Sequence, residues 1–107
     1  MVTEYPYRST RLDLNVPLWF EVEGARVRGQ CLNVSESGLL TKLDRIVDIW
    51  VVGELSLSIY EYELNIKARV ARLVDRDTGL AFMTKSEADR RTVRMLMDIA
   101  SASSRER

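Results

Sequence analysis

Short segments in which apolar and polar residues alternate dominate this sequence and narrow its possible folds. Residues 55–60 and 64–71 show the alternation most clearly, with apolar side chains at every second position: Leu55, Leu57, Ile59, Leu64, Ile66, Ala68 and Val70. A period of two places one side of a segment against a core and the other in solvent, which is typical of a β-strand. The link around residues 60–62 is short, so we predict that these two strands form an antiparallel pair.

Further strands are predicted on both sides of this pair. Residues 16–29 indicate a hairpin that turns at Glu23–Gly24, and we expect a bulge near Gly29, where the strict alternation fails. Residues 39–41 and 80–83 are predicted as two more strands, because each follows a segment rich in turn-forming residues, 33–38 and 75–79 respectively. Residues 43–53 mix helical spacing with other apolar positions, and we interpret them as a loop or a short helical turn.

The C-terminal part has a different, helical period. Ser86 is a plausible N-cap, and apolar residues follow at i, i+3, i+4 and i+7: Val93, Leu96, Met97 and Ala100. We expect this helix to end near Ser101. The order of about six short strands and then one helix predicts an all-β barrel or sandwich with a C-terminal helix. We divide the chain into an arm at 1–13, a barrel plus helix at 14–100 and a flexible tail at 101–107.

Composition excludes several classes of function. The 107 residues are enough for one domain, and 16 basic and 16 acidic side chains give no net charge, which disfavours a dedicated binder of nucleic-acid polymers. There is no histidine, the most common general base and zinc ligand, and no other catalytic or metal constellation stands out, so we expect neither an enzyme nor a metal site.

Other sequence signals bear on location. Cys31 is the single cysteine, so no internal disulfide can form. The first residues lack the basic start and apolar run of a signal peptide, and no stretch approaches the length of a transmembrane helix. We therefore expect a cytoplasmic protein without membrane insertion. The sequence leaves the oligomeric state open.

Three short motifs occur in an informative order. Asn33-x-Ser35-x-x-Gly38 lies between two predicted strands, an arginine-bearing arm at residues 7–12 precedes the first strand, and a pair of strands at 68–82 follows. Together they resemble the PilZ domain, a bacterial module, over roughly residues 7–100. Each motif alone is weak, since polar turns and solvated arginines are common, but their order makes the set more specific.

The resemblance implies a fold, a ligand and a site. PilZ domains are six-stranded antiparallel β-barrels with a C-terminal helix, and they read the second messenger cyclic di-GMP. By this resemblance Arg8 and Arg11 would clamp the ligand, because a guanidinium matches both a phosphate and the O6/N7 edge of guanine. Asn33 and Ser35 would supply polar contacts, and Gly38 would permit a backbone conformation that other residues resist. A downstream protein partner would read the bound state.

The arm departs from the family pattern at one position. The family spacing is Arg-x-x-x-Arg, so with Arg11 as the second arginine the first would stand at position 7, where this chain has Tyr7. Arg8 comes one residue later, which shifts a side chain about 3.3 Å along an extended arm. Tyr7 is a candidate for stacking on a guanine. The alternative hypothesis is therefore a PilZ-like protein-interaction module that binds no nucleotide.

Overall fold

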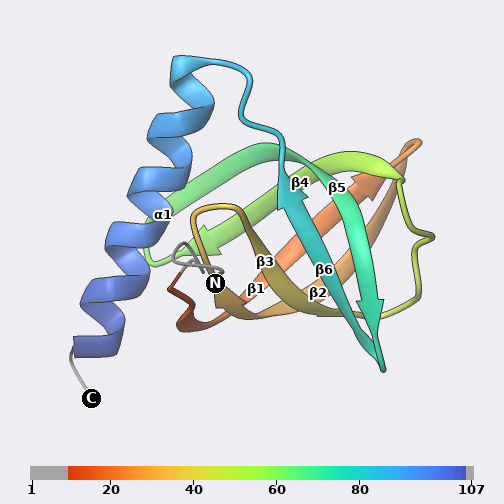
Figure 1. Cartoon of the computed structure of the whole chain (residues 1–107), viewed down its shortest axis with the longest axis horizontal. Helices are drawn as coiled ribbons and strands as arrows, with labels where there is room; N and C mark the ends of the chain where they lie inside the picture. Colours follow the sequence, from red (N-terminus) through yellow and green to blue (C-terminus); the bar gives the residue numbers. More distant parts are fainter. Residues whose placement is uncertain (1–9, 106–107) are drawn as a thin grey trace, which may run out of the picture.

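The computed structural model describes residues 10–105 of the chain. Over this range the elements are β1 (Leu12–Val22), β2 (Ala25–Val34), β3 (Gly38–Leu43), β4 (Val52–Ile59), β5 (Tyr62–Val74), β6 (Asp77–Phe82) and α1 (Glu87–Arg105). The strands form a closed barrel in the order β1-β2-β3-β6-β5-β4, and every neighbouring pair is antiparallel. Figure 1 shows α1 standing beside one end of this barrel. The predicted fold class, an antiparallel barrel with a C-terminal helix, is confirmed.

The barrel interior is filled by the alternate apolar residues of the strands. Its largest fully buried side chains are Phe20, Leu18, Leu39, Leu55, Leu57, Ile59, Leu80 and Leu96. The last of these comes from α1, which also buries Val93 and Ala100 and packs against β1 and β5. The helical period therefore marks the face of α1 that joins the core of the barrel.

The start of α1 is fixed by three hydrogen bonds, two of which join Ser86 and Asp89 reciprocally. The Asp89 backbone N–H donates to Ser86 Oγ at 3.1 Å, and the Asp89 carboxylate accepts from the backbone N–H groups of Lys85 and Ser86 at 3.0 and 3.2 Å. The bond from Lys85 is the main reason that the pKa of Asp89 is lowered from its ordinary value. The predicted cap at Ser86 is confirmed as a capping box with aspartate at its third position.

Two element bounds differ from the sequence predictions. The helix continues to Arg105 and does not end near Ser101, because Ala102 and Arg105 favour helix and serine tolerates it. The first strand begins at Leu12, inside the predicted arm, and Pro17 lies within it. Proline is tolerated there because β1 pairs with β4 only from Leu18 onward, so its missing N–H breaks no bond on that side.

The bulge that we predicted near Gly29 lies further along the strand, between Cys31 and Asn33. Gly29 pairs regularly with Leu18 on β1 and with Leu43 on β3. A Cβ atom at this position would lie 2.7 Å from Leu43 Cδ2, a side-chain end that can move, and 3.0 Å from the Lys42 carbonyl oxygen, so glycine eases the packing of β2 against β3. The register shifts instead fall between residues 13 and 16, 31 and 33, and 70 and 72.

Candidate functional site

A row of directly paired residues crosses the outer face of four neighbouring strands. Asn33 on β2 pairs with Leu40 on β3, Leu40 pairs with Gly79 on β6, and Gly79 pairs with Arg72 on β5. Directly opposed residues of a sheet point to the same face. The row therefore brings an amide and a guanidinium, 39 residues apart in sequence (72 − 33), to the same outer surface of the barrel.

Two β-bulges decide which residues stand in this row. Without the shift between residues 31 and 33, the partner of Leu40 would be Leu32, and Asn33 would be displaced from the row. Without the shift between residues 70 and 72, the partner of Gly79 would be Ala71. Each bulge therefore substitutes a polar side chain for an apolar one on the outer face, a role that bulges often play next to functional sites.

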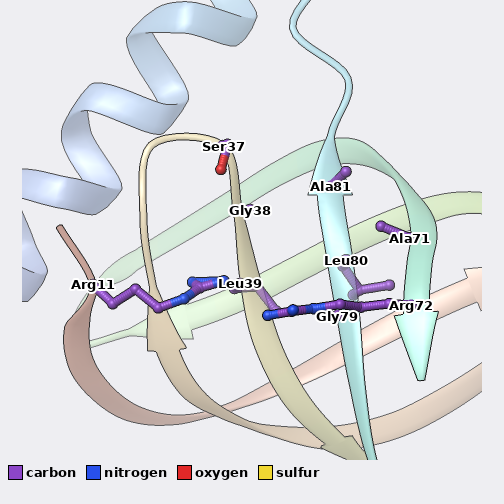
Figure 2. Close-up of a pocket in the computed structure, with 9 residues that line it drawn as sticks. All are labelled: Arg11, Ser37, Gly38, Leu39, Ala71, Arg72, Gly79, Leu80 and Ala81. Atoms are coloured by element: carbon purple, nitrogen blue, oxygen red, sulfur yellow. The ribbon is translucent and has the colours of Figure 1, made fainter. Parts of the chain in front are cut away.

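Gly79 lets the side chain of Arg72 lie flat across the sheet. A Cβ atom at position 79 would be 2.9 Å from Arg72 Cγ and 3.2 Å from its Nε, so the stem of Arg72 passes directly over this glycine. Figure 2 shows the side chain crossing β6 with its nitrogen end directed toward β3. A larger residue at position 79 would therefore push the guanidinium away from the outer face of β3.

Arg11 reaches the same surface from the other side. Together with Arg72 and the edge of the β2–β3 turn it lines an open cavity of about 300 Å³, whose wall also includes Ser37, Gly38, Leu39, Ala71, Gly79, Leu80 and Ala81. Figure 2 shows the two arginines extended toward one another, with their nitrogen ends approaching over β3. No carboxylate is among the described residues that line the cavity, so its charge is positive and suits an anionic group.

The turn at residues 35–38 is held by Ser35, which is buried. Its Oγ donates to the Gly38 carbonyl at 3.3 Å and accepts from the Ser37 N–H at 3.3 Å, and its backbone N–H also donates to the Gly38 carbonyl at 2.8 Å. The turn is tied to β6 by the Phe82 N–H, which donates to the Ser37 carbonyl at 2.9 Å. Ser35 therefore shapes the rim of the cavity from below the surface.

Gly38 is needed for a reason that the sequence did not indicate. Among residues 10–105 the one glycine with a positive φ is Gly24, so Gly38 adopts an ordinary strand conformation and the predicted special backbone is wrong. A Cβ atom on Gly38 would lie 2.1 Å from the Leu80 carbonyl oxygen. The glycine instead lets β3 approach β6 closely at the wall of the cavity.

Asn33 carries an unsatisfied polar atom. Its Oδ1 is buried, and no described residue supplies a hydrogen bond to it. Buried acceptors without a partner are uncommon and destabilise the fold. Asn33 therefore has an acceptor without a partner in the same row as Arg72.

An expected result follows for Asn33→Ala. Removing the unsatisfied oxygen should leave the free energy of unfolding unchanged or raise it by up to about 1 kcal/mol, because the buried acceptor then disappears. Urea denaturation followed by tryptophan fluorescence measures this. Asn65→Ala is the matched control: Asn65 Oδ1 accepts from Ser56 Oγ at 2.7 Å, so its loss should be neutral or slightly destabilising. A clear loss of stability in Asn33→Ala alone would mean that the amide supports the fold.

The structure bears unevenly on the predicted site residues. Arg11 and Gly38 line the same cavity. Asn33 stands in the adjoining row of paired residues, and Ser35 is buried in the turn. Tyr7 and Arg8 lie outside the described residues. Sequence reasoning missed Arg72. The signal was present, because continued alternation from Val70 would turn Arg72 into the core, and a charged residue at an inward position indicates a bulge.

Three further features of the described residues concern the reactivity of the cysteine, metal binding and membrane-spanning helices. Burial raises the pKa of Cys31 to about 12, which keeps its thiol protonated and unreactive. Residues 10–105 contain no group of three His, Cys, Asp or Glu side chains placed to hold a metal ion. In the same range no helix has the length and apolarity needed to span a bilayer.

The family model and the solved structures agree with one another. The family model described as PilZ domain matches residues 7–98. The solved PilZ domain of YcgR from Escherichia coli, with c-di-GMP, has a TM-score of 0.83 at 10% identity and covers 95% of this chain and 96% of its own. The PilZ domain of CeSA from a cellulose-synthesizing bacterium has a TM-score of 0.72 at 16% identity, covering 82% and 94%. An uncharacterized Legionella protein has a TM-score of 0.65 at 19% identity, covering 92% and 99%. The search of curated proteins gave no match.

Proposed function

The chain belongs to the PilZ domain family, a family of cyclic di-GMP receptors, and we propose that it is itself a receptor for cyclic di-GMP. The ligand would lie on the outer face of β3 and β6, over the cavity lined by Arg11 and Arg72. The occupied receptor would act in the cytoplasm and be read by a downstream protein in bacterial signalling.

The observation that carries the proposal is the approach of Arg11 and Arg72 over β3. Two guanidinium groups directed at one cavity without a neighbouring carboxylate repel each other, and a bound anion removes that repulsion. Cyclic di-GMP presents two phosphates and two guanines, and all four groups accept bidentate hydrogen bonds from arginine. The site therefore supplies the donors that this ligand requires.

The remaining residues have distinct roles in the proposed complex. Asn33 Oδ1 would accept a hydrogen bond from the ligand, for example from a guanine amino group. Ser35 and Gly38 would act indirectly, Ser35 by shaping the turn and Gly38 by holding β3 against β6. From the arm, Arg8 would add a contact to a phosphate or guanine, and Tyr7 would stack on a guanine.

Arg72 would offer a second guanidinium despite the altered spacing of the two arginines in the arm. Tyr7 stands where the family has its first arm arginine, so the arm offers Arg8 and Arg11 at a shorter spacing. Arg72 extends from β5, and its direction is fixed by the bulge and by Gly79. The barrel wall thus provides a second guanidinium for the cavity whatever contact Arg8 makes.

The test is isothermal titration of the whole chain with cyclic di-GMP. We expect micromolar or tighter binding, and we expect Arg11→Ala and Arg72→Ala each to weaken it by about tenfold or more, the range for a lost charge-assisted hydrogen bond. Arg91→Ala is the matched control, because Arg91 is an exposed arginine on α1, away from the cavity, and its loss should leave binding unchanged.

Two outcomes would contradict the proposal. Absence of heat and of thermal stabilisation at near-millimolar ligand would show that the chain is a PilZ domain without nucleotide binding, and a protein-interaction module would then be the better description. Binding that survives both Arg11→Ala and Arg72→Ala would place the ligand at another surface.

A further inference from the structure

The loop between β3 and β4 exposes apolar side chains that the barrel core does not use. Ile46 and Trp50 are 72% and 68% exposed, and Ile49 and Val52 beside them are also exposed. We call these four residues the loop patch. Figure 1 shows this loop on the side of the barrel opposite α1. Single exposed apolar residues are ordinary, but a group of four that includes a tryptophan is typical of an interaction surface.

The loop patch is held in place by the backbone. The Trp50 N–H donates to the Val70 carbonyl and the Val70 N–H donates to the Val51 carbonyl, both at 2.8 Å. Trp50 has a φ of 77°, which is unfavourable for a residue with a Cβ atom, and the Arg69 guanidinium lies 4.9 Å from its ring centroid. A strained, ordered and exposed tryptophan loses little conformational entropy when it is buried by a partner.

Charges of both signs border the loop patch. Asp44, Arg45 and Asp48 belong to the loop, and Arg69 stacks on Trp50. Within residues 10–105 none of these four side chains forms an ion pair. The two acids and two bases of this set balance, and the residues beside Val52 add Glu21, Glu23 and Glu54 against Lys67, so the border has no basic excess, which disfavours an anionic membrane as the partner. They suit a surface that must complement itself, as a two-fold interface requires.

From these observations we propose that the loop patch is the contact of a homodimer, with a second copy of this chain as its occupant. The two-fold arrangement buries both Trp50 rings at its centre. It sets Arg69 of each copy against Asp48 of the other copy. The patch is small, so the dimer is weak. It dissociates at low micromolar protein concentration and forms as the protein concentration approaches millimolar. The proposal does not depend on a ligand at the arginine cavity, whose lining includes none of the four loop-patch residues.

Sedimentation velocity of the whole chain without ligand tests the proposal over this range of concentration. We expect the mean mass to rise from monomer toward dimer, and we expect Trp50→Ser to weaken association by about tenfold or more, as for a central tryptophan in an interface. Tyr60→Ser is the matched control, because Tyr60 is also an aromatic residue with positive φ, is 75% exposed, and lies in the turn at the far end of the β4–β5 hairpin. It should dimerise like the wild type.

A charge-swap experiment tests the two-fold pairing itself. Asp48→Arg and Arg69→Asp alone should each be monomeric, since each places like charges across the interface. Mixed in equal amounts they should form a heterodimer in which both ion pairs are restored with reversed sign. A chain that stays monomeric throughout, association that Trp50→Ser leaves unchanged, or single variants whose mixture does not associate would each overturn the proposal.

Discussion

Gly38→Ala is expected to lower the free energy of unfolding by about 3 kcal/mol, the upper end of the range for overpacking. The added Cβ atom would lie 2.1 Å from the Leu80 carbonyl oxygen, which is backbone and cannot rotate away. Relief requires β3 to move from β6, against the bond from the Phe82 N–H to the Ser37 carbonyl. Denaturation with urea, followed by tryptophan fluorescence, measures the change.

Gly24→Ala is the control that separates two causes of destabilisation, steric crowding and an unfavourable backbone conformation. Gly24 has a φ of 83° and no heavy atom within 4 Å of an added Cβ, so substitution there carries conformational strain alone. We expect a loss of about 1 kcal/mol, at the lower end of the range for a residue forced into the left-handed region. If Gly38→Ala were no more destabilising than Gly24→Ala, the close approach of β3 and β6 would not be the reason for glycine at position 38.

Phe20→Ala is expected to have the largest effect of any single truncation, about 3–5 kcal/mol. Phe20 is fully buried, pairs with Val27 on β2 and Leu55 on β4, and fills the space beside Gly53. Since β1 closes the barrel through its pairing with β4, a cavity here weakens the closure as well as the core. A domain of this size has a total stability of about 5–15 kcal/mol, so the variant should be largely unfolded at modest denaturant concentration.

The control for Phe20→Ala is Ile46→Ala, which removes apolar atoms from an exposed loop residue. At a concentration where the chain is monomeric it should change the free energy of unfolding by less than about 0.5 kcal/mol. Equal effects of the two truncations would mean that the interior of the barrel is not packed as described.

The order of the elements was readable from the sequence because most strands follow a strict period of two. In residues 64–70 the four apolar residues all proved buried, and the turns at Glu23–Gly24 and Asp75–Arg76 fall where the polar residues cluster, although β6 already begins at Asp77, inside the predicted turn. Ser86 likewise marks the true start of the helix. These features depend on neighbours in sequence, so a single chain displays them.

The site was only partly readable, because it depends on where the alternation stops. The bulges at Leu32 and Ala71 each shift the following residue by one position, and a single sequence does not show which strand will absorb an extra residue. The charge of Arg72 at an otherwise inward position did mark the second bulge, but that signal was overlooked, and Gly38 was assigned the wrong physical role. The contacts of Arg8 and Tyr7, the three parts of the domain division and cyclic di-GMP itself stay predictions.

The closed ring of strands limits how any other chain can attach to this one. β1 pairs with both β2 and β4, so over the described residues the sheet has no free outer strand whose N–H and C=O groups await a partner. The closure between β1 and β4 spans only Leu18–Glu21, but the ring leaves no whole strand for a peptide or a second copy to pair with, so side chains such as those of the loop patch and α1 offer the larger surface for recognition. A closed sheet of this kind can display an exposed tryptophan with less of the aggregation that an open, apolar sheet edge would bring.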